Sequence, residues 1–349
     1  MPKISVGIVT YNRINLLRNL VQSILNQDYK DIEIIIGNDF TEAPILAKDL
    51  GFDDDRVIII NNQINLGEVD NLNNVLRNAK GQYFVWQFDD DLFHKSFFTK
   101  AAKYFSENSS IKILYTDYIH IFNQFDNDYK VDFGCITNYA ANDFFSAYLR
   151  GDIRVLPYNG IFEREALIAM GGAEALVPNK IGIYSEYYLL ARVSKLVTIG
   201  FCSEKLCMSR IHNGSWSRSS GELNLFCTAG LELLRRTINI CNFEDSESSI
   251  NNYLNLSTSI ISTYFIKSIQ LNIFKSINLT LNYCKKVNII LIENRIISNE
   301  NYKILKNRIY KLILLLYLKY LVKKIIPLYL ARYLYPIRAF LSKITRSPF

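Results

Sequence analysis

The chain has 349 residues, of which 49% are hydrophobic and 21% are charged, a composition that is typical of a folded protein with a large core and excludes intrinsic disorder. The formal net charge is +7, but residues 301–349 hold eleven Lys or Arg and no acidic residue, so the first 300 residues carry about −4. The basic charge therefore belongs to the end of the chain, and a nucleic-acid-binding function of the whole protein is not supported.

Strand and helix patterns alternate along the first 90 residues. Residues 3–10 predict a strand that ends in a polar turn, and apolar residues then recur with helical spacing from Leu16 to Leu25, with Asn12 or Asn15 as the expected cap. Further strands are expected at 31–37, 56–60 and 83–88, with a helix at 67–80 between the last two. Such alternation predicts an α/β fold with a mostly parallel sheet flanked by helices.

The patterns after residue 90 are less regular. We expect another strand over 111–117 and 118–122, a helix at 163–170, the start of another helix at 185–192, and a loop at 210–217. Residues 221–300 are rich in Asn, Ser, Ile and Leu and predict a helical C-terminal region.

The cysteine pattern and the hydropathy of the chain bear on its location. Six cysteines are scattered without a C-x-x-C pair, which predicts buried thiols in a reducing compartment rather than disulfides or zinc ligands. The first residues lack the apolar core of a signal peptide, and no uncharged apolar run reaches the length of a membrane span. We therefore expect the main body of the protein in the cytoplasm.

The strand at 83–88 ends in an acidic triplet, Asp89, Asp90 and Asp91. Adjoining carboxylates repel one another, and a divalent cation removes that repulsion while leaving coordination positions for phosphate oxygens. The alternative is a solvated acidic turn. Ligands of parallel α/β sheets bind beyond the carboxyl ends of the strands. We therefore expect the triplet to share one crevice with Thr10, Asp39 and Asn65.

Several motifs follow one another in a fixed order along the first 220 residues. They are Ser5-Val-Gly-Ile-Val-Thr-Tyr-Asn-Arg13, residues 20–29, 33–39, 65–67 and 79–83, the acidic triplet, Gly171-Gly172, Glu186, and Arg210-x-His212-x-x-Ser215-x-Ser217. Together they resemble the family 2 glycosyltransferases of the GT-A fold, over roughly residues 2 to 220. Trp86 before the triplet is similar to the branch that builds bacterial surface polysaccharides, such as O-antigen or capsule, from hexoses or deoxysugars.

The resemblance implies a nucleotide-sugar donor site. Its residues would be Thr10, Tyr11, Asn12, Arg13, Asp39, Asn65, Gly67, Asp89 and Asp90. Asp39 would accept the imide N–H of uracil or thymine, so UDP or dTDP is the expected nucleotide, and GDP remains an alternative. A turn-capping role for Asp39 is the other interpretation.

The resemblance also implies a divalent metal, Mn²⁺ or Mg²⁺, held by Asp90, Asp91 and His212. The first aspartate of the family motif falls on Phe88, which leaves open whether Asp90 or Asp91 is the direct ligand; Asp90 is favoured. The metal would act as a Lewis acid and template on the departing diphosphate. His212 as a loop residue without a ligand role is the alternative.

Glu186 is the candidate catalytic base. It matches the second acid of a Glu-Asp pair in the family, and Ser185 replaces the first. An acceptor hydroxyl must lose a proton to a carboxylate, and a single displacement inverts the anomeric centre. The competing interpretation of Glu186 is a first-turn acid that stabilises the helix dipole.

The end of the chain predicts contact with a membrane. Residues 301–349 combine apolar clusters with wholly cationic charge, which suits an anionic lipid surface, although a packed helix with a solvated basic face is the alternative. We expect a glycosyltransferase domain at 1–220, a helical extension at 221–300 and a membrane-associating tail at 301–349. A lipid-linked saccharide acceptor at the inner face of the cell membrane would fit this arrangement.

Two other functions share parts of these patterns. A sugar nucleotidyltransferase would carry a Gly-rich basic loop after the first strand, and a dehydrogenase would carry G-x-G-x-x-G; residues 10–13 hold no glycine. A degenerate, non-catalytic protein that binds a membrane surface is the third possibility, because Phe88 and Ser185 depart from the family pattern.

Overall fold

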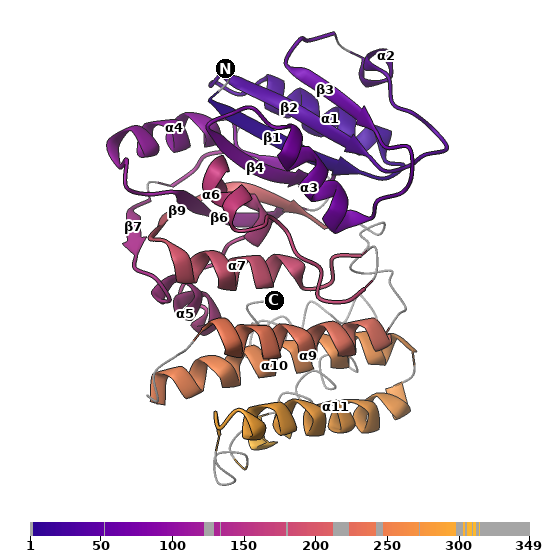
Figure 1. Ribbon diagram of the computed structural model, residues 1–349, viewed down its shortest axis with the longest axis vertical. Helices are drawn as coiled ribbons and strands as arrows, with labels where there is room; N and C mark the ends of the chain where they lie inside the picture. Colours follow the sequence, from indigo (N-terminus) through magenta and orange to yellow (C-terminus); the bar gives the residue numbers. More distant parts are fainter. Residues whose placement is uncertain are drawn as a thin grey trace, which may run out of the picture. The chain divides into compact units, whose positions relative to one another are not determined.

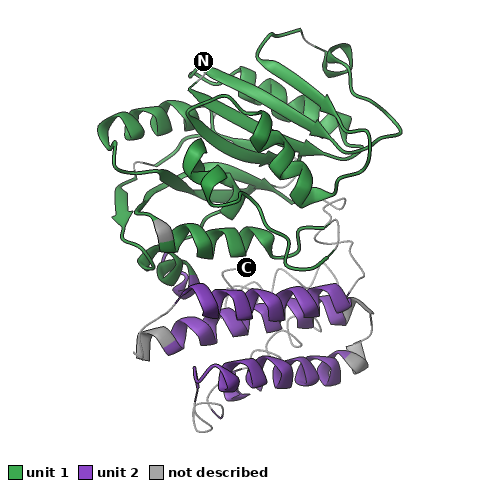
Figure 2. Ribbon diagram, in the orientation of Figure 1, with its two compact units in different colours: residues 1–148, 153–219 green, residues 149–152, 220–349 purple. Residues whose placement is uncertain are grey.

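The structure, a computed structural model, divides into two compact units. Unit 1 comprises Met1–Tyr148 and Ile153–Ser219, and unit 2 comprises Leu149–Asp152 and Ser220–Phe349 (Figure 2). The structure describes residues 3–51, 53–121, 129–132, 134–178, 181–211, 223–241, 247–271, 273–297, 303, 306–308, 310–311 and 314. Each unit is described by itself.

Unit 1 is built on one mixed sheet with the strand order β3-β2-β1-β4-β8-β6-β9-β5, in which β7 also pairs with β9 (Figure 1). The strands are β1 (Ile4–Thr10), β2 (Ile32–Asn38), β3 (Val57–Asn61), β4 (Tyr83–Phe88), β5 (Leu92–Phe93), β6 (Ile113–Ile121), β7 (Ile136–Tyr139), β8 (Ile161–Glu163) and β9 (Ile199–Arg210). The first four strands are mutually parallel, whereas β8 runs antiparallel to both β4 and β6.

The helices of unit 1 connect these strands. They are α1 (Ile14–Leu25), α2 (Ala47–Leu50), α3 (Glu68–Asn78), α4 (Phe97–Glu107), α5 (Asp143–Arg150), α6 (Arg164–Ala169) and α7 (Ser185–Leu196), with a 3₁₀ turn η1 at Pro157–Asn159. Helix α5 ends at the boundary of the two units. The predicted α/β fold with a helical C-terminal region is confirmed.

Helices cover both faces of the sheet, as the alternation of side chains along β1 shows. Ile4, Val6 and Ile8 point into a core with residues of α1 and α4. Gly7 points the other way, where an added Cβ would lie 2.8 Å from Val75 Cγ2 of α3 and 2.5 Å from the Phe84 ring. Successive residues of a strand face opposite sides, so β1 needs bulk on one face and glycine on the other.

The parallel strands bring their polar ends to one edge of the sheet. Thr10 pairs with Asn38, Asn38 pairs with Asn61, and Val9 pairs with Phe88, the last residue before the acidic triplet. The backbone N–H of Asp39 donates to the Thr10 carbonyl at 3.1 Å. The register therefore places Thr10, Asp39 and the triplet on the same edge, as the sequence predicts.

Local details correct the expected cap of α1. Helix α1 begins at Ile14 with Arg13 at its N-cap and no side-chain hydrogen bond there, so the predicted cap by Asn12 or Asn15 is wrong. Asn12 instead has a φ of 54°, in the left-handed region that Asn tolerates. The strand expected over 111–122 is β6, which pairs irregularly with β9 around Asp117.

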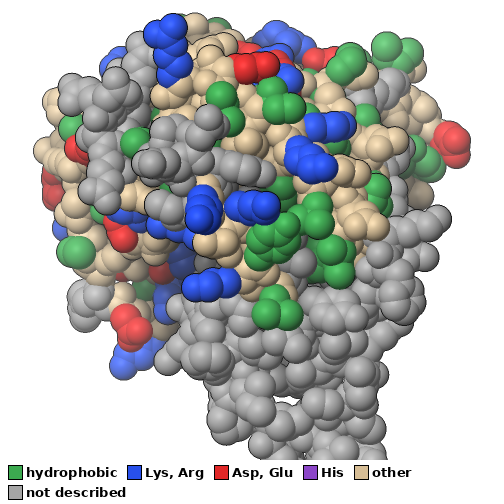
Figure 3. All heavy atoms as spheres, turned by 90° about the horizontal axis from the view of Figure 1, so that it is seen from below, with side chains coloured by type: hydrophobic (Ala, Val, Ile, Leu, Met, Phe, Trp, Pro, Cys, Tyr) green, Lys and Arg blue, Asp and Glu red, His purple; other side chains and the backbone are tan. Residues whose placement is uncertain are grey.

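Unit 2 is helical over its described residues. Its helices are α9 (Leu223–Ile240), α10 (Glu247–Leu271) and α11 (Ile273–Glu293). Within the described part of the chain, no helix has both the length and the hydropathy to cross a membrane. Exposed apolar side chains occur on α11 (Ile277, Leu279, Ile289 and Ile292). On the face of the molecule drawn in Figure 3, Lys and Arg side chains lie beside hydrophobic ones. Most of the predicted tail at 301–349 lies outside the described residues.

Candidate functional site

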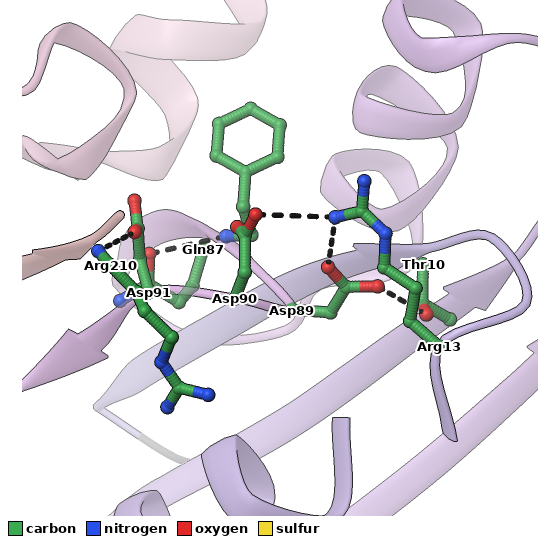
Figure 4. A network of polar contacts seen from close by, with 8 residues as sticks. Thr10, Arg13, Gln87, Asp89, Asp90, Asp91 and Arg210 are labelled. Carbon is green, nitrogen blue, oxygen red and sulfur yellow. Dashed lines mark hydrogen bonds and ion pairs between the residues drawn. The ribbon is translucent and has the colours of Figure 1, made fainter. Parts of the chain in front are cut away.

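Thr10, Arg13 and the acidic triplet form one polar network at the end of β4 (Figure 4). The Thr10 hydroxyl donates to Asp89 Oδ2 at 2.7 Å. The Arg13 guanidinium donates to Asp89 Oδ1 at 3.0 Å and to Asp90 Oδ2 at 3.2 Å. These contacts join residues 76 to 79 positions apart, so the turn after β1 and the turn after β4 are held together by charge.

The three carboxylates of the triplet point in different directions. Asp89 is buried against β1, and Asp91 turns towards β9, where its Oδ1 accepts the backbone N–H of Arg210 at 2.9 Å. Asp90 lies between them, and its side chain is 16% exposed. Among the described residues, no group of three or more His, Cys, Asp or Glu could hold a metal ion. Asp90 rather than Asp91 as the direct metal ligand stays a prediction.

Burial dominates the electrostatics of the triplet. It raises the pKa of Asp89 to about 6, although the Thr10 hydroxyl and the Arg13 charge act in the opposite direction. Burial, followed by the charge of Asp90, raises the pKa of Asp91 well above its usual range. Adjacent carboxylates at a poorly solvated strand end repel one another, as the sequence predicts, and both this repulsion and burial favour the neutral form.

Asp39 organises the loop that precedes α3. Its Oδ1 accepts the backbone N–H of Leu66 at 2.7 Å and the Asn62 amide at 3.1 Å, and its Oδ2 accepts the N–H of Gly67 at 2.7 Å. Gly67 has a φ of 88°, which favours glycine. The turn-capping alternative for Asp39 thus has a direct structural basis, and a role towards a nucleotide base stays a prediction.

The remaining predicted donor residues surround this edge. The Tyr11 side chain is 53% exposed and meets the Phe40 ring edge-on at 5.2 Å. Asn12 follows it in the turn after β1, and Asn65 is half-buried in the loop that Asp39 holds. His212 lies outside the described residues.

Aromatic residues pack behind the triplet. Phe88, which stands where the family has its first aspartate, lies 5.8 Å from the Tyr158 ring, and Trp86 lies 5.3 Å from the same ring. The Trp86 indole N–H donates to the Leu72 carbonyl at 2.9 Å. Phe88 therefore packs against the Tyr158 ring of η1.

Glu186 lies in the first turn of α7. The helix starts after Tyr184, whose φ of 61° places it in the left-handed region. Ser185, fully buried, donates its hydroxyl to the Gly182 carbonyl at 2.9 Å and is 2.6 Å from the Tyr158 hydroxyl. Phe88, Tyr158 and Ser185 thus connect the end of β4 to the start of α7, where the base candidate lies.

Burial, and then the charge of Glu68, raise the pKa of Glu186 to about 8. Burial likewise raises the pKa of Glu68, which begins α3. Glu68 was not predicted as a site residue. It directly follows Asn65-Leu-Gly67, but only the fold shows that it meets the loop before α7, because its Oε2 accepts the N–H of Gly182, 114 residues away.

Comparison with known proteins now assigns the family. The model of the family described as glycosyl transferase family 2 matches residues 5–147, which run from β1 into α5. Through these residues, the chain belongs to glycosyl transferase family 2.

Two relatives illustrate the extent of the sequence similarity. The GalNAc(5)-diNAcBac-PP-undecaprenol β-1,3-glucosyltransferase of Campylobacter jejuni is 39% identical over 94 residues, which are 26% of this chain and 30% of that enzyme. An uncharacterized glycosyltransferase of Haemophilus influenzae is 28% identical over 225 residues, covering 62% of this chain and 68% of that protein. The match therefore spans less than a third of the length of the Campylobacter enzyme.

A solved structure agrees with the fold. The crystal structure of S. aureus TarS in complex with UDP-GlcNAc superposes with a TM-score of 0.53 at 14% identity, covering 86% of this chain and 91% of that one. The shared architecture is a mixed, mostly parallel α/β sheet followed by C-terminal helices.

Proposed function

We propose that the protein is an inverting glycosyltransferase. It moves a sugar from a nucleotide-diphosphate donor, UDP or dTDP, to a hydroxyl of a lipid-linked oligosaccharide in cell-surface polysaccharide synthesis. The observation that carries the proposal is the polar network of Thr10, Arg13, Asp89 and Asp90 at the edge of a family 2 domain.

The donor nucleotide would lie along this edge. Asp39 and the loop at 65–67 would meet the base and ribose, with Tyr11 and Asn12 beside them, and Asp89 would meet the ribose. Arg13 is suited to the diphosphate because its guanidinium is always charged and already faces the triplet. TarS, which shares the fold, was solved with UDP-GlcNAc, and this supports a uridine or thymidine donor.

A divalent metal fits the donor chemistry of the triplet. Mg²⁺ and Mn²⁺ prefer hard oxygen ligands and are commonly held by one or two carboxylates together with substrate phosphates. Asp90 offers such a carboxylate and faces the Arg13 guanidinium, which is suited to the same diphosphate. Bound there, the ion would neutralise charge on the departing diphosphate.

Glu186 would accept the proton of the acceptor hydroxyl. Its raised pKa, about 8, makes it a stronger base than an exposed carboxylate, and the ionised fraction increases through neutral pH. A single displacement from the face opposite the diphosphate would invert the anomeric centre. The proposal requires no covalent intermediate.

The acceptor is proposed from the relative and from the charge of the tail. The Campylobacter enzyme is named for an undecaprenol-linked glycan. A cationic, apolar segment at 301–349 suits an anionic membrane surface, where a lipid carrier would present its saccharide. We accordingly propose a transferase domain at 1–220, a helical extension at 221–300 and a peripheral membrane tail at 301–349.

Thermal unfolding of the full chain with UDP, dTDP or GDP, each with and without Mn²⁺, tests the donor site. A ligand that binds the native state alone stabilises it by about 2.7 kcal/mol at a hundredfold excess over its dissociation constant. We expect a metal-dependent rise in Tm with one diphosphate. Asp90→Asn should abolish the metal dependence, and Asp55→Asn, at an exposed position before β3, should retain it. A wild-type protein that responds to none of the three diphosphates would contradict the proposed donor site.

A further inference from the structure

Glu68 and the base candidate Glu186 belong to helices that start side by side, although the two residues are 118 positions apart in the sequence. Glu68 is the first residue of α3, and Glu186 is the second residue of α7. The turn at Gly182–Ser185 lies between them. Glu68 Oε2 accepts the Gly182 N–H at 3.2 Å, and the Gly182 carbonyl accepts both the backbone N–H of Ser185 at 3.0 Å and its hydroxyl at 2.9 Å.

The packing around Gly182 is tight. A Cβ added there would lie 2.9 Å from Glu68 Oε1 and 2.7 Å from Ser185 Oγ. The Glu68 carboxyl therefore contacts the Gly182–Ser185 turn, which sets the orientation of the first residues of α7. Glu68 also follows Gly67, whose N–H is held by Asp39, so the same loop reaches the proposed donor site at one end and the base candidate at the other.

The surroundings of Glu186 are aromatic and poorly solvated. Tyr148 of α5, Tyr158 of η1 and Tyr187 of α7 all have pKa values raised first by burial and then by neighbouring charges, Glu186 among them. Among the described residues, the cation whose charge acts on Tyr158 is Arg192 of α7, which donates to Glu174 and to the carbonyls of Met170 and Gly172. Two carboxyls in such a place favour a state in which one of them keeps its proton.

We propose that Glu68 is a positioning residue for Glu186: its carboxyl fixes the turn before α7 and places a second acidic group close to the carboxyl of Glu186. The inference rests on the proposed function for its catalytic meaning. The second carboxyl makes Glu186 a stronger base, because ionisation of one carboxyl opposes ionisation of the other. Glu68 also replaces, from another helix, the acidity that Ser185 does not supply.

Carbon-13 NMR titration of the full chain labelled at glutamate Cδ tests the coupling without any substrate. Glu186→Gln and Glu68→Gln assign the two signals. In Glu68→Gln the side-chain oxygen still accepts the Gly182 N–H, but the charge is absent. We expect the Glu186 midpoint to fall by about one pH unit in this variant. Glu68→Asp, which keeps the charge, should leave the midpoint high. Glu107→Gln, on the exposed face of α4, removes an equal charge and should leave it unchanged.

An unchanged Glu186 midpoint in Glu68→Gln would overturn the proposal, as would an equal shift in Glu107→Gln. Once a donor and acceptor are known, the acid limb of the pH–rate profile should move down with the NMR midpoint in Glu68→Gln. Loss of rate without movement of that limb would reduce Glu68 to a structural residue. If the midpoint shifts as expected but no diphosphate binds the wild-type protein, the coupling stands and the proposed function fails.

Discussion

Replacement of Asp39 by Asn separates the structural role of this carboxylate from any role in binding a nucleotide. The buried side chain accepts three hydrogen bonds, from Leu66, Gly67 and Asn62. An Asn side chain retains one acceptor oxygen. With that oxygen towards Leu66 and Asn62, its NH₂ group faces the Gly67 N–H across 2.7 Å, and two donors oppose each other.

The expected cost follows from these contacts. Hydrogen bonds to a charged group contribute about 1.5–3 kcal/mol each, and a buried donor left without a partner adds about 1–3 kcal/mol. Two of the three bonds survive in weaker, uncharged form. Asp39→Asn should therefore lower the free energy of unfolding by about 2–4 kcal/mol.

Urea unfolding monitored by tryptophan fluorescence measures this effect, because Trp86 lies in the buried part of β4. Asp49→Asn is the matched control. The Asp49 side chain accepts an exposed hydrogen bond from the Leu46 N–H at 2.8 Å, and its replacement should cost less than about 1 kcal/mol. If Asp39→Asn and Asp49→Asn prove equally stable, the loop at 65–67 does not depend on Asp39, and the reasoning is refuted.

Two further predictions concern the start of α7. The pKa of Glu186 in the folded protein, about 8, exceeds its ordinary value of 4.5, so ionisation of Glu186 lowers the stability of the fold as pH rises from 4.5 to 8. Glu186→Gln should therefore unfold at a higher urea concentration than wild type at pH 8 and at nearly the same concentration at pH 4. A difference that does not change with pH would contradict the burial of this charge. Gly182→Ala should lower the free energy of unfolding by about 1–3 kcal/mol, because its Cβ would lie 2.7 Å from Ser185 Oγ and 2.9 Å from Glu68 Oε1. Gly151→Ala, at a φ of 80° with nothing within 4 Å, measures the cost of backbone strain without close packing. A loss below about 1 kcal/mol at Gly182 would argue against close packing of the turn.

The sequence by itself determined the parallel half of the sheet and the residues at its edge. β1 to β4 are short apolar runs with polar ends, and the carboxyl ends of parallel strands must meet at the same edge. The pattern therefore located Thr10, Asp39 and the acidic triplet before any contact was known. It also predicted a helical C-terminal region from residues 221–300, which are rich in Asn, Ser, Ile and Leu.

Only the tertiary structure decided the directions in which these side chains point. The triplet is one motif in the sequence, yet Asp89 bonds to Thr10 and Asp91 bonds to the backbone of Arg210. The sequence predicts that Asp39 binds the nucleotide of the sugar donor, whereas the structure shows its oxygens accepting the backbone N–H groups of Leu66 and Gly67. Hydrogen-bond partners distant in sequence depend on packing, which local propensity and spacing do not encode.

Glu68 shows the same limit most clearly. Its sequence neighbourhood is that of an ordinary first-turn acid, favoured by the helix dipole. Its pairing with the Gly182 turn requires α3 and α7 to start side by side, and that arrangement depends on the short β8 and on η1, which bring the later part of the chain back against β4. The carboxyl pair arises from the packing of two separate helix starts, whereas the donor-site motifs arise from consecutive strand ends.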